Sequence, residues 1–306
     1  MNIEVYNQEG SMVRVEEPTA MTVGVFDGVH RGHRELLAHL TPLTSHFSPL
    51  VLTLTAHPSF VLGRRESEYW LDDPEEHMRL LFEAGAKYVA VLPFTQEVAQ
   101  MSACRMARLL YDQLNMRSLL LGYDSRFGSK ANDDFDRLPQ LAAELGFTIQ
   151  RGEPFTVDGE PISSSRIRAS LTKGLVEETA ALLGRNYSIT GTVTHGRGVG
   201  HTLGFPTANI DLATTRKMLP AHGVYAVRVT SDQWPAVSGM ANLGDAPTFG
   251  VDKPLLEVHL IDYNGDLYGE TVTVEFLHRI RNIQCFGSPC ELQAQLMKDI
   301  EEARRW

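Results

Sequence analysis

Apolar and polar residues follow two different patterns along the chain, and the pattern changes after about residue 184. In the first part, short apolar runs predict buried strands over residues 21–26, 50–55, 88–93, 118–122 and 147–151. The segments between them have apolar residues at helical spacing and predict helices over 32–41, 74–84, 102–114 and 134–145. Buried strands that alternate with amphipathic helices are typical of an α/β domain whose parallel sheet is covered on both faces.

The pattern after residue 184 is that of an antiparallel barrel. Short alternating runs predict strands over 187–194, 223–230, 236–243, 255–262 and 271–276. Turn residues separate these runs, and Asn264-Gly265 is the strongest hairpin signal in the chain. Several short strands with turns between them indicate a compact β-barrel.

Helices are expected on both sides of the barrel segment. Two of them, over 163–172 and 175–183, lead into it, and Gly184 is expected to end the second. A last amphipathic helix begins at Ser288, and Glu291 three residues later completes a capping box. No Gly/Ser-rich linker separates the two patterns, so the join between them is expected to be helical.

Composition and charge narrow the class of protein. We expect an α/β domain over residues 1–184 and a barrel domain with a terminal helix over 185–306, and 43% hydrophobic residues suffice for both cores. The net charge of −10 argues against a nucleic-acid binder. The three cysteines form no CxxC pair, which suits a reducing cytoplasm. The polar N-terminus is unlike a signal peptide, and no apolar run approaches the roughly 18 residues of a membrane helix.

The strongest candidate for chemistry is the turn Gly24–His33, between the first predicted strand and its helix. Such a turn exposes backbone N–H groups and the positive end of the helix dipole, which together bind anions. His30 and His33 are three residues apart, so they share one helix face and can face the same phosphate. The spacing fits neither a P-loop nor a dinucleotide fingerprint. A turn without function and a zinc pair are the alternatives, although no further zinc ligand motif lies nearby.

Three further segments lie where α/β domains bind ligands. Gly122–Gly128 and His57-Pro58 follow predicted strands. Ser163–Arg168 starts a predicted helix, where hydroxyls cap N–H groups and can donate to phosphate, and Arg168 can bind phosphate oxygens bidentately. Taken alone, the Ser163–Arg168 segment is better explained by an ordinary helix cap. Together with the histidine turn it favours a phosphate site.

These motifs, in this order, resemble the bacterial family of bifunctional riboflavin kinase/FMN adenylyltransferases. The histidine turn marks the wider nucleotidylyltransferase superfamily, and Ser163–Arg168 narrows it. Pro206-Thr207-Ala208-Asn209 matches the riboflavin-kinase signature and is highly specific. Further matches are Gly223–Ala226, Asn242–Gly244, Pro247–Gly250, Leu256–Leu260, Leu267–Gly269 and Arg281–Phe286. The resemblance covers nearly the whole chain and implies a Rossmann-like adenylyltransferase domain followed by a riboflavin-kinase barrel.

For the first domain, the resemblance implies transfer of AMP from ATP to FMN, which gives FAD and pyrophosphate. His30 and His33 would be the catalytic donors to the phosphates. The nucleotide site would consist of Gly24, Phe26, Asp27, Gly28, Gly32, Ser164, Ser165 and Arg168. The reaction needs no protein nucleophile, because alignment and charge neutralisation supply the rate.

For the barrel, the resemblance implies phosphorylation of riboflavin by ATP to FMN. Glu257 would be the catalytic base, although a lone acid in an alternating strand is by itself better explained by a solvent-facing position. Thr207 and Asn209 would hold Mg²⁺ and the phosphates, because hard Mg²⁺ prefers oxygen ligands. The remaining binding residues would be Gly198 and Gly204 for the nucleotide and Arg281 and Phe286 for the flavin.

Several positions depart from the family pattern. They are Thr55 and Ala56 after the second strand, Val199 and His201 in the kinase loop, and Ile283 in the flavin loop. Two alternatives therefore stay open, an enzyme with only one working half and a flavin- or nucleotide-binding protein without catalysis. The retained histidines and Glu257 argue against the second. The family also allows weak homo-oligomers, which nothing in the sequence marks.

Overall fold

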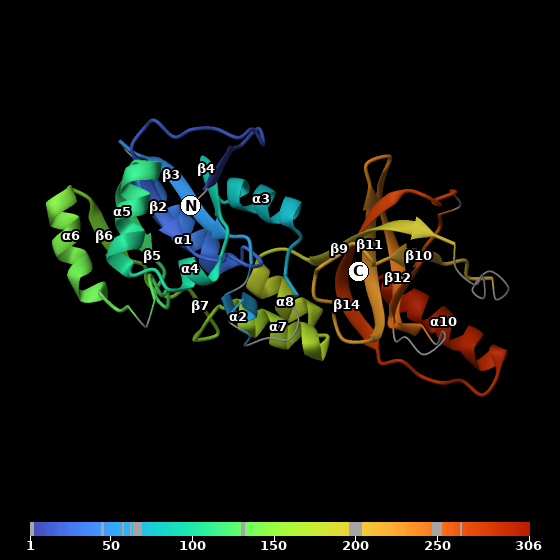
Figure 1. Ribbon diagram of the computed structural model, residues 1–306. Coiled ribbons are helices and arrows are strands. Elements are labelled where there is room, and N and C mark those ends of the chain that lie inside the picture. The colour runs from blue at the N-terminus through green and yellow to red at the C-terminus, as the bar shows by residue number, and fades with distance from the viewer. Residues whose placement is uncertain are drawn as a thin grey trace. The chain divides into compact units, whose positions relative to one another are not determined.

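The computed structural model describes residues 3–43, 46–56, 58–61, 63, 69–129, 132–195, 204–246, 253–263 and 265–306. The chain forms two compact units, Met1–Ser164 and Ser165–Trp306, each with its own sheet (Figure 1). Among the described residues, no helix combines the length and the apolar character needed to cross a membrane.

A six-stranded sheet organises the first unit, with the strand order β1-β4-β3-β2-β5-β6 (Figure 1). The strands are β1 (Glu4–Asn7), β2 (Thr19–Val23), β3 (Ser48–Leu54), β4 (Tyr88–Leu92), β5 (Met116–Leu121) and β6 (Thr148–Arg151). Strands β2 to β6 pair in parallel, and β1 pairs antiparallel with β4 at one edge. The predicted parallel sheet is confirmed, and β1 is an edge strand that the apolar pattern did not predict.

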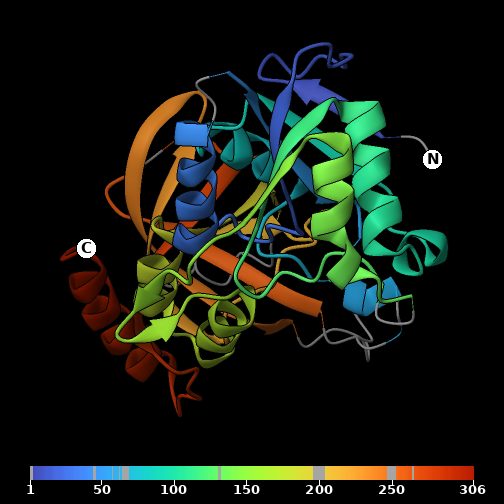
Figure 2. The ribbon, with the colours of Figure 1, turned by 90° about the vertical axis from the view of Figure 1, so that its left-hand side faces the viewer.

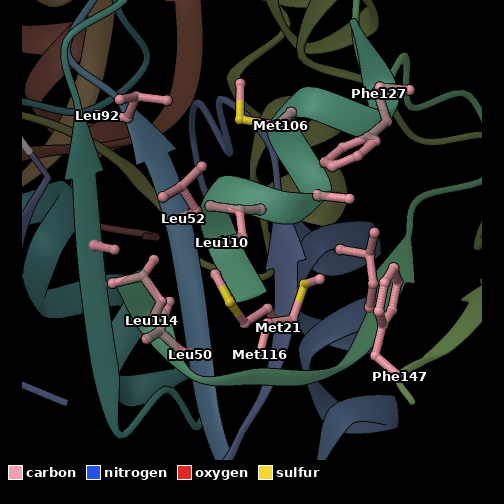
Figure 3. Packing of buried hydrophobic residues seen from close by; sticks show 14 of the residues in the cluster. Met21, Leu50, Leu52, Leu92, Met106, Leu110, Leu114, Met116, Phe127 and Phe147 are labelled. Carbon is pink, nitrogen blue, oxygen red and sulfur yellow. The ribbon is translucent and has the colours of Figure 1, made fainter. Parts of the chain in front are cut away.

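Helices cover both faces of this sheet. They are α1 (Arg31–Leu43), α2 (Pro58–Val61), α3 (Pro74–Glu83), α4 (Gln96–Ala99), α5 (Ala103–Leu114) and α6 (Leu138–Leu145), with a 3₁₀ turn at Phe135–Arg137. Figure 2 shows α1 (blue) and α5 with α6 (green) on opposite sides of the sheet. Leu50 and Leu52 of β3 pack with Leu110 of α5 (Figure 3), whereas Val51 packs with Leu80 of α3. Side chains alternate along a strand, so β3 serves two cores.

A closed barrel organises the second unit, with the strand order β10-β13-β12-β11-β14-β9. The strands are β9 (Tyr187–Thr194), β10 (Ala208–Asp211), β11 (Gly223–Ser231), β12 (Trp234–Ala246), β13 (Lys253–Leu260) and β14 (Thr271–Arg281). Helix α10 (Pro289–Ala303) packs on the barrel, where Ile300 and Ala303 meet Val224 and Met240. The Glu291 N–H donates to the Ser288 hydroxyl (3.3 Å), as the capping box predicts. The predicted antiparallel barrel with a terminal helix is confirmed.

The prediction of a hairpin at Asn264-Gly265 is wrong. Among the described strands, β13 pairs with β10 and β12, and β14 pairs with β11 and β9, so the strands that flank this dipeptide are not neighbours. Asn264 itself lies outside the described residues. A tight turn instead closes the β11–β12 hairpin, where Ser231 pairs with Trp234. The residues of this turn therefore did not determine which strands pair. The strand order of the closed barrel determined it.

Two helices precede the barrel, after a small ribbon of β7 (Thr156–Val157) and β8 (Glu160–Pro161). They are α7 (Ser164–Lys173) and α8 (Val176–Leu183), and Gly184 ends α8 in a left-handed conformation, as predicted. From Ser165 onward they belong to the second unit. For example, the Ala221 N–H donates to the Leu171 carbonyl (2.9 Å). The compact units thus divide after Ser164, the first residue of α7, and the division of the two activities at residue 184 stays a prediction.

Candidate active sites

The turn between β2 and α1 contains three residues with left-handed backbone conformations. Phe26, Gly28 and Val29 have positive φ angles of 53°, 84° and 34°. The Val29 N–H donates to the Phe26 carbonyl (2.8 Å), which closes the turn before α1 begins at Arg31. Positive φ is costly for residues other than glycine and persists only where the surroundings enforce it. The neighbours of this turn must therefore supply that restraint.

The two histidines of the turn lie one on the other. The rings of His30 and His33 stack with centroids 3.6 Å apart and an interplanar angle of 17°. The His33 N–H donates to His30 Nδ1 (3.3 Å), and the Phe26 ring meets the His33 ring edge-on at 5.2 Å. A Cβ atom on Gly24 would lie 3.1 Å from the Phe26 ring, and one on Gly32 would lie 3.3 Å from the His30 ring. Both glycines therefore leave room for this stack, and the two histidines share one face as predicted.

Electrostatic surroundings keep His33 neutral. Its pKa lies well below the ordinary value, because the side chain loses contact with water and because His30 and His77 lie nearby. A neutral imidazole carries one hydrogen and can donate from only one nitrogen. The Nδ1 atom of His33 has no hydrogen-bond partner within the part of the chain that the structure describes. His33 Nδ1 is thus a buried polar atom for which the described residues supply no partner.

A pocket opens beside the histidine pair, at the carboxyl ends of the parallel strands. It is lined by the turn and first residues of α1, by the segment after β5, by the segment after β6, and by residues 162–164. Members that bear on chemistry are His30, His33, Gly122, Glu153, Ser163 and Ser164. The Ser164 hydroxyl donates to the Asp27 carbonyl (2.9 Å). Segments that lie far apart in the sequence thus meet at one sheet edge, as the strand-end motifs predicted.

On the barrel, strand register places Glu257 between two asparagines. Glu257 of β13 lies directly opposite Asn209 of β10 and Asn242 of β12. Directly opposite residues of antiparallel strands share one face of the sheet, so two amides and a carboxylate form a row. Leu256 and Val258 are buried at the positions on either side. The row therefore points to the opposite face from these core residues.

Oxygen donors of three kinds occur at this row. Thr207 directly precedes β10, and Asn209 is the second residue of that strand. With Glu257 they offer a hydroxyl, an amide carbonyl and a carboxylate, which are ligands of the kind that Mg²⁺ prefers. Within the described ranges, no group of three or more His, Cys, Asp or Glu side chains could hold a metal. The donor set fits a hard cation shared with phosphates and does not fit zinc.

Family models match the two parts of the chain separately. The FAD synthetase model matches residues 13–166, and the riboflavin kinase model matches residues 183–306. The bifunctional riboflavin kinase/FMN adenylyltransferase of Haemophilus influenzae is 37% identical over 299 residues, which cover 95% of each chain. The chain belongs to the bifunctional riboflavin kinase/FMN adenylyltransferase family. The Bacillus subtilis protein of that name is 33% identical over 94% of this chain and 92% of its own.

A solved structure has the same fold along this chain. It is described as a macrolide-efflux protein from Streptococcus pneumoniae, with a TM-score of 0.89 and 30% identity, and the match covers 98% of this chain and 97% of that one. That description refers to the Streptococcus pneumoniae protein alone. Both domains of a bifunctional riboflavin kinase/FMN adenylyltransferase are present here in one chain, which supports FAD biosynthesis from riboflavin.

Helix α10 holds Arg281, one of the two flavin-loop residues expected of this family. Arg281, at the end of β14, donates from Nε to the buried carboxylate of Asp299 (2.9 Å), and its Nη2 lies 2.7 Å from the same carboxylate. The Phe286 ring lies 5.6 Å from the Arg281 guanidinium, and Ile283 between them is exposed. The guanidinium is therefore engaged within the fold, and flavin contact by Arg281 and Phe286 stays a prediction.

Other predicted residues of the family are placed as follows. Outside the described residues lie His57, Gly198, Val199 and His201. Gly204 has a φ of 85° and open space around it, since a Cβ atom added there would meet no other atom within 4 Å. Ser165 and Arg168 lie on α7 in the second unit. Thr55 and Ala56 follow β3, as expected from the sequence. The nucleotide contacts of Ser165, Arg168 and Gly204 stay predictions.

Glu153 and Phe155 are among the pocket residues that were not predicted. Both follow β6, the last parallel strand, and line the pocket with the histidines. The Arg31 guanidinium lies over the Phe155 ring at 5.1 Å from its centre, which ties this segment to the start of α1. Their position after a parallel strand was the available signal, because ligands bind at that edge. Nothing in their local sequence distinguishes them from other loop residues.

Proposed function

We propose that the histidine turn is the FMN adenylyltransferase site of this chain and that the Asn209–Glu257 row is its riboflavin kinase site. The stacked pair of His30 and His33, beside the hydroxyls of Ser163 and Ser164, carries the proposal. The chain then converts riboflavin and ATP to FMN and ADP, and converts FMN and a second ATP to FAD and pyrophosphate.

In adenylyl transfer, a phosphate oxygen of FMN attacks the α-phosphorus of ATP. A new P–O bond forms, the bond to the oxygen that bridges to the β-phosphate breaks, and pyrophosphate leaves with that electron pair. His30 Nδ1 accepts from the His33 N–H, so a neutral His30 carries its hydrogen on Nε2 and can donate it to a phosphate. Neutral His33 provides a second donor. Both sit at the positive end of the α1 dipole, which favours charge that develops on the phosphates.

The rest of the nucleotide site follows from the same turn. Its proposed members are Gly24, Phe26, Asp27, Gly28, Gly32, Ser164, Ser165 and Arg168. The glycines let the backbone approach the phosphates. The Ser165 hydroxyl can donate to a phosphate oxygen, whereas the Ser164 hydroxyl donates to the Asp27 carbonyl and so holds the turn beside the phosphates. Arg168 supplies the positive charge and the two parallel N–H donors that suit a phosphate. This set favours alignment of the two substrates over any covalent step.

On the barrel, Glu257 takes the proton of the primary ribityl hydroxyl while that oxygen attacks the γ-phosphorus of ATP, and ADP leaves. Thr207 and Asn209 would hold Mg²⁺, and the ion would neutralise charge on the phosphates. The pairing of Asn209 with Glu257 supports this assignment, because it puts an amide oxygen that could bind the ion beside the carboxylate that would act as base. The proposed binding residues are Gly198 and Gly204 for the nucleotide and Arg281 and Phe286 for riboflavin.

We place the enzyme in the cytoplasm, without a nucleic-acid partner. Cys104, Cys285 and Cys290 are all free thiols, which suits a reducing compartment. The net charge of −10 disfavours a general contact with nucleic acid. Weak self-association of the chain stays a prediction.

Two single variants test both site assignments in one protein. His33→Ala removes a donor from the first site, and we expect FAD formation from FMN to fall by about 10²-fold or more, with FMN formation from riboflavin unchanged. Glu257→Gln should do the opposite and lower FMN formation by about 10²- to 10⁴-fold, while supplied FMN is still converted to FAD. Chromatography of riboflavin, FMN and FAD after incubation with ATP and Mg²⁺ measures both.

Each outcome decides one assignment. If His33→Ala forms FAD at the rate of the parent protein, the adenylyltransferase assignment is wrong. If Glu257→Gln forms FMN at the rate of the parent protein, the riboflavin kinase assignment is wrong. If the parent makes FMN but no FAD, or makes FAD only from supplied FMN, a single half works. A parent that binds flavin or nucleotide without turnover would favour the non-catalytic alternative.

A further inference from the structure

A second segment of the first unit closes onto the histidine turn. Asp27 Oδ1 accepts the N–H of Leu71 (2.8 Å), and Asp72 Oδ1 accepts the N–H of Gly28 (3.1 Å). Each segment thus offers one carboxylate and one N–H to the other. Both carboxylates are buried, since Asp27 is 1% and Asp72 is 3% exposed. These reciprocal bonds hold Gly28, with its positive φ, against residues 71–72.

Asp72 is bound on its other side by a histidine of α3. Its Oδ2 lies 3.0 Å from His77 Nδ1, and His77 Nε2 lies 3.1 Å from the Thr53 hydroxyl oxygen. Thr53 in turn donates to the Val25 carbonyl (3.1 Å). We call this set of bonds the Asp72–His77 circuit, because it leaves the turn at Gly28 and returns to the turn at Val25.

The hydrogens of the circuit can be counted. A threonine hydroxyl has one hydrogen, and a carbonyl can only accept, so the hydrogen of Thr53 goes to Val25. His77 Nε2 must then donate to the Thr53 oxygen, and His77 Nδ1 must donate to the Asp72 carboxylate. The Asp72 carboxylate, which would be costly to bury without donors, thus accepts from Gly28 and from His77.

We propose that Asp72 and His77 are positioning residues for adenylyl transfer, which act by holding the turn from Val25 to Gly28 and with it the histidine pair. The inference rests on the proposed adenylyltransferase site. Among the described residues, neither Asp72 nor His77 lines the pocket, so they act through the turn. The proximity of His77 to His33, one cause of the lowered pKa of His33, agrees with this placement.

Variants at Asp72 separate the hydrogen bonds from the charge. Asp72→Ala removes the acceptor for both Gly28 and His77, so kcat for FAD formation from FMN should fall about tenfold to hundredfold, with a smaller change in the KM for ATP. Asp72→Asn keeps the circuit, because its amide oxygen accepts from Gly28 and its NH₂ donates to His77 Nδ1. The neutral ring then donates from Nε2 to Thr53. This variant should recover most of the lost kcat.

Thr53→Val interrupts the circuit at its other end without a change of volume. It removes both the acceptor for His77 Nε2 and the donor to Val25, and it should lower the same kcat. It also keeps the test decisive if Asp72→Ala does not fold. Riboflavin phosphorylation in each sample serves as the internal measure of active enzyme, because it belongs to the barrel.

Thr19→Val is a matched control for Thr53→Val. Thr19 is the first residue of β2, whereas the histidine turn follows the last residue of that strand. The Thr19 hydroxyl is fully buried and donates to the Leu114 carbonyl (2.9 Å). Thr19→Val should therefore lower the thermal midpoint like Thr53→Val, but leave kcat for FAD formation at the parental value. A loss of kcat in Thr19→Val equal to that in Thr53→Val would overturn the positioning role.

Two further results would also overturn it. One is a parental kcat in Thr53→Val and in folded Asp72→Ala, and the other is an Asp72→Asn protein as slow as Asp72→Ala. His33→Ala, assayed in parallel, distinguishes this failure from failure of the site assignment. If His33→Ala loses FAD formation while the circuit variants do not, only the positioning role is withdrawn.

Discussion

A neutral His33 meets phosphate differently from a charged one. Loss of water contact and the nearby His30 and His77 keep its pKa well below the ordinary value. Nucleotide phosphates would act in the opposite direction, because nearby negative charge favours the protonated form. The side chain can therefore donate to a phosphate without first having to carry a charge, and its charge then depends on what occupies the pocket.

The stability of the first unit should depend on pH through His33. The ordinary pKa is 6.5, and the folded-state pKa lies well below it, so the unfolded chain binds the proton more readily. Below about pH 6.5 the free energy of unfolding should decrease as the pH falls, and above it this contribution is constant. Urea unfolding at pH values from about 5 to 7.5, followed by the fluorescence of Trp70, measures this dependence.

The signal of Trp70 is isolated by Trp234→Phe and Trp306→Phe, which are both in the second unit. His33→Gln in that background is the control, because it removes the titrating group. Its free energy of unfolding should decline less on acidification than that of the parent. Equal declines in the two proteins would contradict the lowered pKa.

Among the individual residues, the histidine pair could be predicted, because a spacing of three residues on one helix is a local property. Asp72 and His77 could not be predicted in the same way. Asp72 bonds to Gly28 across 44 positions of sequence, and His77 bonds to Thr53 across 24. Only the folded sheet brings these groups together, and no local spacing marks them.

Among the elements, helix α10 is attached to the barrel by apolar contacts and by a buried ion pair. Asp299 is 1% exposed and accepts from Arg281 and from Gln295 Nε2 (2.8 Å). Arg281 also begins the loop that carries Phe286. The helix therefore fixes where the predicted flavin loop leaves β14.

Asp299→Ala should destabilise the second unit. It leaves the Arg281 guanidinium, whose side chain is 14% exposed, without its carboxylate, and breaking one side of a buried pair costs about 3–5 kcal/mol. The KM for riboflavin should rise as well, because the loop loses its anchor. Thermal unfolding and riboflavin kinase assays measure the two effects.

The matched control for this prediction is Glu302→Ala on the same helix. Glu302 pairs with the exposed Arg305 at 2.6 Å, and such surface pairs contribute about 0–1 kcal/mol. A thermal midpoint of Asp299→Ala as high as that of Glu302→Ala would contradict the anchoring role of Asp299.

Elements with a strong apolar period could be predicted, and elements fixed by partners could not. Strand β1 has Val5 as its one buried residue and is held at the edge of the sheet by its pairing with β4. Strand β10 is four residues long and closes the barrel between β13 and β9. The turn at Asn264-Gly265 has the residues of a hairpin, but long-range pairing assigns other neighbours to its strands. Closure of a barrel is a property of all its strands together.

For the molecule as a whole, the second compact unit is longer than the barrel itself. It begins at Ser165 and includes α8 and all of α7 except its first residue, Ser164. Arg279 of β14 donates to the Lys173 carbonyl (3.0 Å), and Glu177 of α8 pairs with His278. The two helices therefore complete the hydrogen bonding of the barrel wall.

Two fragments test this boundary. A fragment of residues 165–306 should fold and phosphorylate riboflavin, whereas one of residues 185–306 lacks α7 and α8 and should be less stable. Several lost hydrogen bonds at about 1 kcal/mol each correspond to a thermal midpoint lower by more than about 10 °C. Thermal unfolding and a riboflavin kinase assay of both fragments measure this difference. Equal midpoints would show that the helices are dispensable for the barrel.

The boundary inside Ser163-Ser164-Ser165 also limits how such a chain can be recombined. The first unit ends at Ser164 and the second begins at Ser165, so no spare residues separate them. A crossover that exchanged barrels between two relatives at this boundary would take Ser164 from one parent and the rest of α7 from the other. The Ser163–Arg168 motif of such a chimera would therefore have two parents, and its adenylyl transfer would report how far the two lineages have diverged within that motif.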